Sequence, residues 1–204
     1  MRFSRVRLGL CLLVANLSLM PAQAQKLAPL PCSGPAQEGQ TDEMLVYGDG
    51  FAFAVKEPPG WKGDCEIARK YGVNIVFLPE AAESKSADVT IRVRVNDKTD
   101  EDTAADLQAD RDTYKREYPQ VQFDELAVSH PQYATFSEVF FLPGSFYEYV
   151  AYVNPGPKHH LLLSVAMSKA RSAATPAELE AFRKVLGSLQ VLSDSLKVVK
   201  PGVK

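Results

Sequence analysis

The sequence has few of the residues that mark common catalytic and metal sites: among 204 residues there are three cysteines, three histidines and one tryptophan. No pair of cysteines has the Cys-x-x-Cys spacing of a thioredoxin-like redox motif. There is no Gly-x-Ser-x-Gly nucleophile elbow, and no glycine-rich loop opens a helix. We therefore assign no catalytic residue, no cofactor site and no metal site from the sequence.

Basic and apolar residues are separated at the N-terminus in the pattern of an export signal. Three arginines lie within the first seven residues, residues 8–20 are almost all apolar, and Ala22-Gln23-Ala24 follows shortly after. The apolar run is shorter than the roughly 20 residues that a membrane-spanning helix needs. We predict a cleavable signal peptide over residues 1–24; a retained anchor or a buried N-terminal helix is the alternative.

The sequence after this signal predicts an exported protein without a lipid anchor. Neither Cys11 nor Cys32 lies where a lipoprotein would carry its lipid, so we expect a periplasmic or secreted protein with no stable membrane insertion. Loss of residues 1–24 removes three arginines and no acid, which changes the formal net charge from −2 to −5. A mildly acidic protein is a poor partner for nucleic acid or anionic lipid.

Composition divides the exported chain into three parts. Residues 25–44 are rich in Pro, Gly, Gln and Ala and are predicted to be a flexible leader. Residues 45–192 contain the patterned apolar segments and are predicted to be one folded domain. Residues 193–204 are predicted to be a polar tail.

Two cysteines remain after signal removal, Cys32 and Cys65, and they are candidates for a disulfide. An exported protein meets an oxidising environment, and a loop of this length would contribute about 3–4 kcal/mol by the chain-entropy argument. Two separate free thiols are the alternative.

Residues 45–192 show strand patterns interrupted by two helical patterns. The segment 88–95 alternates valine or isoleucine with Thr90, Arg92 and Arg94, as expected of a strand with one buried face. The predicted strands are 44–55, 73–78, 88–95, 121–128, 133–142, 146–153 and 159–168, and the predicted helices are 104–118 and 176–190. We expect Thr103 to cap the first helix and Thr175 the second. This order predicts an α+β fold with a central antiparallel sheet of about six to seven strands and helices packed on it.

A short motif resembles the opening of PsbP-like domains. The residues are Gly50-Phe51-Ala52-Phe53-Ala54-Val55 followed by Pro58-Pro59-Gly60-Trp61, and the later order of strands and helices is similar too. The resemblance covers residues 45–192 and includes the bacterial envelope proteins of DcrB type. It implies an α/β/α sandwich and a non-enzymatic role as an adaptor, assembly factor or chaperone-like protein. The chain departs from the pattern in an insert over residues 62–71, which carries Cys65.

Other clusters have structural explanations that we prefer. The acidic run over residues 97–112 does not have the spacing of a calcium loop, and acids favour a helix N-terminus. The three histidines are expected in exposed turns. The aromatic residues over 136–152 are expected to be sheet core on both faces, one covered by each helix. Any ring left exposed there would be a candidate partner surface, for which we single out Tyr147, Tyr149 and Tyr152.

These observations favour a protein that binds another envelope protein over an enzyme. Two alternatives stay open: an exported hydrolase-type enzyme whose site the sequence does not show, and a binder of a small apolar ligand or lipid.

Overall fold

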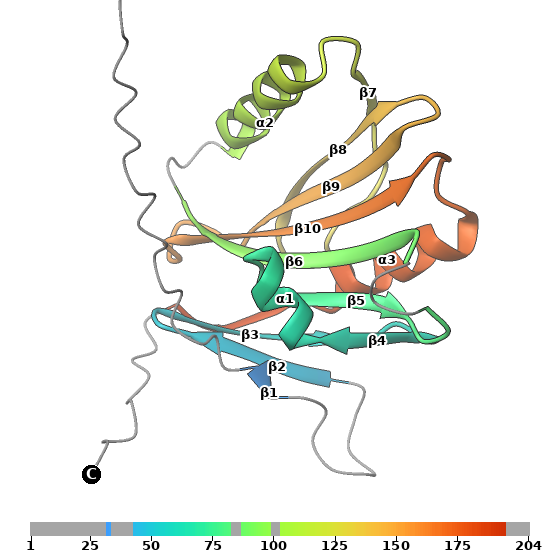
Figure 1. The fold of residues 1–204 in the computed structure, drawn as a ribbon. Coiled ribbons are helices and arrows are strands. Elements are labelled where there is room, and N and C mark those ends of the chain that lie inside the picture. The colour runs from blue at the N-terminus through green and yellow to red at the C-terminus, as the bar shows by residue number, and fades with distance from the viewer. Residues whose placement is uncertain (1–31, 34–42, 83–86, 99–102, 195–204) are drawn as a thin grey trace, which may run out of the picture.

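The computed structural model describes residues 32–33, 43–82, 87–98 and 103–194. The predicted signal peptide and most of the predicted leader and tail lie outside these residues. The fold is α+β, as predicted, and contains two antiparallel sheets and three helices (Figure 1). The elements, in chain order, are β1 (Cys32–Ser33), β2 (Glu43–Gly48), β3 (Phe51–Lys56), β4 (Trp61–Asp64), α1 (Cys65–Tyr71), β5 (Ile75–Pro79), β6 (Val89–Asp97), α2 (Thr103–Glu117), β7 (Gln122–Glu125), β8 (Ala134–Leu142), β9 (Phe146–Asn154), β10 (Leu161–Ala170), α3 (Pro176–Ser188) and β11 (Gln190–Ser193).

The larger sheet has seven strands in the order β4-β5-β6-β10-β9-β8-β7, with every neighbouring pair antiparallel. The long strands β6, β10 and β9 form its centre. A tight turn joins β8 to β9, where Ser145 N–H donates to the Leu142 carbonyl at 2.9 Å and Gly144 has φ 77°. The left-handed backbone at this position of the turn favours glycine.

The smaller sheet, β1-β2-β3-β11, was not predicted. The segment 44–55, predicted as one strand, is a hairpin that turns at Gly50, whose φ of 86° suits a residue without a side chain. The helix predicted over residues 176–190 is α3, and it ends at Ser188. The chain then continues into β11, which pairs with β3.

The main hydrophobic core lies between the two sheets and α3. Alternate residues of the central strands face it, among them Ile91 and Val93 of β6 and Val165 and Met167 of β10, all fully buried. Phe182 of α3 is also fully buried in this core. Leu179 is partly buried against it.

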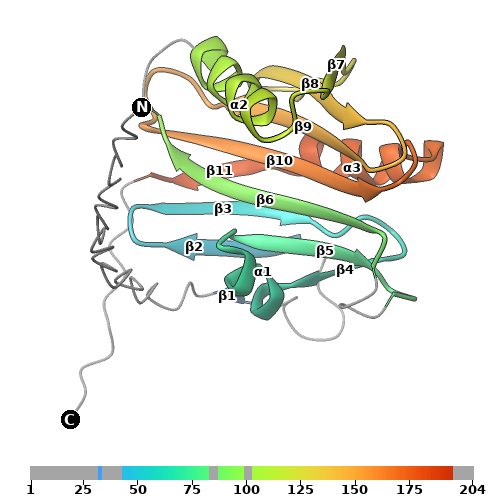
Figure 2. The same ribbon diagram turned by 45° about the horizontal axis from the view of Figure 1, so that its top comes forward.

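The opposite face of the seven-stranded sheet carries α1 and α2 (Figure 2). Helix α1 packs on β5 with Ile67 and Ala68, whereas α2 packs on β8 and β9 with Leu107 and Tyr114. Most aromatic residues of the β8–β9 hairpin are therefore covered, by α2 on one face and by the core with α3 on the other, whereas Phe136 is 38% exposed.

The helix ends show which sequence signals were decisive. Thr175 caps α3 in a capping box with Glu178, as its sequence predicts. The capping prediction for Thr103 is wrong: this residue is the first of α2, it is buried, and its hydroxyl accepts a hydrogen bond from the Asn154 side chain at 3.0 Å. The insert contains most of β4 and all of α1. Helix α1 begins after Asp64, whose side chain caps it.

None of the helices in the described part of the chain combines the length and the apolar character that crossing a membrane would require.

Candidate functional site

Figure 2 shows α1 and α2 apart from each other on one face of the seven-stranded sheet. A groove on this face is lined by residues of both helices and of the strands between them. We call it the interhelical groove. It consists of two adjoining cavities of about 310 and 210 Å³. Four residues line both cavities: Arg94, Asp110, Tyr152 and Ser164.

The groove is hollow because its floor has short side chains on the central strand. Ser164 and Ala166 of β10 face the groove, and their neighbours on β6 are Arg94 and Arg92. On the other side Ser164 is paired with Tyr152 of β9. Long side chains thus form the walls, and short ones form the floor between them.

Arg92 is bonded to neighbouring residues of the sheet. Its guanidinium makes an ion pair with the buried Glu148 and donates to the Ser168 hydroxyl at 2.6 Å. The Ser168 hydroxyl in turn donates to Glu148. Each member of this network has a partner, as buried polar groups require.

Asp110 of α2 projects into the groove and accepts a hydrogen bond from the Tyr152 hydroxyl. Burial, together with the neighbouring Asp106 and Glu148, raises the pKa of Asp110 to about 6, and Arg94 opposes the rise. Asp110 therefore changes its protonation state near pH 6.

Tyr114 closes one wall of the groove from α2. Its ring stacks on Phe140 of β8 with 4.6 Å between ring centroids. Burial, with a smaller contribution from Glu148, raises the pKa of the Tyr114 hydroxyl above its ordinary value. The hydroxyl consequently stays protonated at physiological pH.

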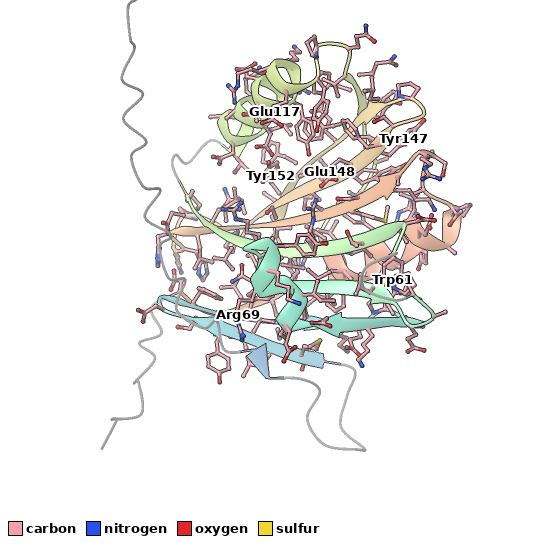
Figure 3. The ribbon with its side chains drawn as sticks, in the orientation of Figure 1. Trp61, Arg69, Glu117, Tyr147, Glu148 and Tyr152 are labelled. Atoms are coloured by element: carbon pink, nitrogen blue, oxygen red, sulfur yellow. The ribbon has the colours of Figure 1, made fainter. Side chains whose placement is uncertain are left out.

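The three tyrosines predicted as a partner surface lie on two different faces of the sheet. Figure 3 labels Tyr147 and Tyr152, one from each face. Tyr147 stacks on Phe141, 5.5 Å between centroids, beside the main core. Tyr149 is buried in that core, and its hydroxyl accepts from Ala174 N–H at 2.8 Å. Tyr152 is buried on the opposite face, in the interhelical groove.

The histidines occupy two separate places. His130 was predicted to be exposed, which is wrong: only 7% of its surface is exposed. Its Nδ1 accepts from the N–H groups of Gln132 and Tyr133, and its Nε2 donates to the Leu189 carbonyl at 2.9 Å. Burial lowers its pKa, so His130 is a neutral structural residue.

His159 and His160 lie before β10, with Nδ1 atoms 3.2 and 3.6 Å from one carboxylate oxygen of Asp194. Within residues 32–33, 43–82, 87–98 and 103–194, no group of three or more His, Cys, Asp or Glu residues is arranged to hold a metal ion.

Sequence reasoning missed most of the groove. Arg92 and Arg94 were recognised as the wetter face of a strand, and Asp110 was interpreted only as a helix acid. The signal that could have found the site is the run of short residues Ser164, Ala166 and Ser168 on one face of a central strand.

Two other hollows are shallower. One, about 550 Å³, lies between α2 and the β7–β8 edge, where Arg111 and Glu138 are already paired to each other. The other, about 450 Å³, is lined only by residues 127–129 and Arg183.

Comparison with known proteins finds similarity in structure alone. No family model and no curated protein matches the sequence. The solution structure of cyanobacterial PsbP (CyanoP) from Synechocystis sp. PCC 6803 is similar, with a TM-score of 0.47 and 16% sequence identity over 78% of this chain and 98% of that chain. No residue role is transferred from this similarity, and the PsbP-like resemblance rests on the sequence motif and the order of the elements. The DcrB-type relationship stays a prediction.

Proposed function

We propose that this chain is an exported binding protein of the cell envelope that receives a segment of another envelope protein in the interhelical groove. The supporting observation is the uncovered strip of sheet between α1 and α2, with short side chains on its floor and Arg94, Tyr152 and Asp110 along it. The mixture of donors, acceptors and aromatic rings suits a polypeptide, whose backbone alternates donors and acceptors, better than a lipid chain.

Site-specific photocrosslinking tests this function. A photoreactive phenylalanine analogue replaces Tyr71, which lines the groove and is 59% exposed. We expect a crosslinked product with one envelope protein, identified by mass spectrometry of the joined peptides. The matched control places the analogue at Leu192, which is 55% exposed on β11.

A groove-filling variant makes this test specific. Ser164→Leu adds volume to the floor, and circular dichroism checks that the variant folds. The Tyr71 product should disappear in this background. The proposal would be refuted if the product persisted with Ser164→Leu, or if Leu192 gave the same product.

Export also bears on the two cysteines, for which we propose the disulfide Cys32–Cys65. Strand β1 is the edge strand of the smaller sheet, beside β2. Cys32 is in β1, paired opposite Val46, and Cys65 is the first residue of α1, partly buried against the main core. The bond would tie the predicted leader to the edge of the domain.

Removing this bond should lower the free energy of unfolding by about 3–4 kcal/mol. Urea unfolding of Cys32→Ser, Cys65→Ser and the double variant measures the effect. All three should lose the same stability, because each removes the same bond. Titration of two free thiols in protein purified from the periplasm would contradict the proposal.

A further inference from the structure

Two arginines two positions apart on β6 face the same groove, yet their side chains have different surroundings. Arg92 is held by Glu148 and Ser168, as described above. Arg94 is exposed, and within the described part of the chain no hydrogen bond or ion pair holds its guanidinium. Arg94 lines both cavities and is paired across the sheet with Ser164. The groove thus presents a cation with free donors at its centre.

The charges around Arg94 restrict which anion could bind it. The charged and titratable groups that line the groove are Asp106, Asp110 and Tyr114 of α2, Arg92 and Asp97 of β6, Glu148 and Tyr152 of β9, and Tyr71 of α1. Because several of them are acidic, they repel a doubly charged anion such as the phosphate dianion more strongly than a singly charged one. A carboxylate carries a single charge, and its planar shape matches two parallel N–H groups of a guanidinium.

We infer that the interhelical groove recognises a carboxylate of the bound polypeptide through the Arg94 guanidinium, with the Ser164 hydroxyl and the Asp110 carboxyl beside it. This inference rests on the proposed function. The carboxylate comes either from the C-terminus of the partner or from an aspartate or glutamate side chain, since both present the same group.

Asp110 makes this recognition depend on pH. Its raised pKa of about 6 means that it is largely neutral at pH 5.5 and largely ionised at pH 7.5. When neutral, it neither repels the ligand nor competes for Arg94, and it has a proton to donate. When ionised, Asp110 repels the ligand carboxylate and competes with it for Arg94. Binding of a carboxylate should therefore weaken as pH rises through about 6.

Three ten-residue fluorescent peptides test the inference by fluorescence anisotropy. The first carries three glutamates and an amidated C-terminus. The second carries glutamines at those positions and a free C-terminal carboxylate, and the third carries glutamines and an amide. At pH 5.5 at least one of the first two should bind about tenfold more tightly than the third, consistent with one charge-assisted hydrogen-bonded pair. Which one binds identifies the source of the carboxylate.

Protein variants connect that binding to the groove. Arg94→Gln should weaken binding of the carboxylate peptide about tenfold, whereas the matched control Arg69→Gln, an exposed arginine of α1, should not. Asp110→Asn should bind with similar affinity at pH 5.5 and 7.5, because the residue that titrates is gone.

Equal affinity for all three peptides, no binding by any of them, or no effect of Arg94→Gln would each overturn the carboxylate assignment. The proposed function would survive these results, because the crosslinking at Tyr71 does not depend on which group the partner presents.

Discussion

Arg111→Met should lower the free energy of unfolding by about 3 kcal/mol, because it leaves a buried carboxylate without its partner. The Arg111 guanidinium of α2 makes a bidentate interaction with Glu138 of β8, whose side chain is only 6% exposed. This pair joins α2 to the sheet. Urea unfolding followed by tryptophan fluorescence, with Trp61 as the only tryptophan, measures the change.

Two further variants separate the ion pair from a general effect of removing an arginine. Arg116→Met alters the same helix at an exposed position and should change stability by less than about 0.5 kcal/mol. In Arg111→Met/Glu138→Leu no carboxylate remains buried, so most of the lost stability should return. A double variant less stable than Arg111→Met would show that the buried charge is not the cause.

Phe182→Ala should lower the free energy of unfolding by about 3–5 kcal/mol. Phe182 is fully buried between α3 and the two sheets, so its removal loses apolar burial and leaves a cavity that rigid strands cannot fill. The matched control is Phe136→Ala on β8, which deletes the same atoms from a side chain that is 38% exposed. It should cost about 1 kcal/mol or less.

Differential scanning calorimetry compares the two phenylalanine variants with the unaltered protein under one buffer condition. A similar loss for Phe136→Ala and Phe182→Ala would mean that α3 is not packed against the core as described. Retention of the native near-UV circular dichroism in both variants would confirm that only stability has changed.

The parts of the fold that could be predicted are those whose structure is determined by residues close together in the sequence. β6 alternates valine and isoleucine with Thr90, Arg92 and Arg94, so its two faces differ chemically and only a strand fits. α3 begins with Thr175, Pro176 and Glu178, which satisfy the first free N–H groups locally. Such signals do not depend on residues elsewhere in the chain.

The parts that were missed depend on distant partners. Leu189 continues the apolar spacing of the helix, and only pairing with β3 makes the residues after it the strand β11. The groove likewise requires knowing that Ser164 lies between Arg94 and Tyr152. Such cross-strand neighbours are set by the order of the strands in the sheet. There β10 lies between β9 and β6, although β6 is far from β10 in the sequence.

The pairing of β11 with β3 joins the last described strand to one of the first. Pairs so distant in sequence close a long loop, which makes them slow steps in folding. A chain that emerges from a translocation channel with its N-terminus first would have the β2–β3 hairpin outside long before β11. Until α3 and β11 arrive, the apolar side of β3 and of the central strands has no cover, so in the proposed export the chain would pass through a period of exposure to proteases and to aggregation.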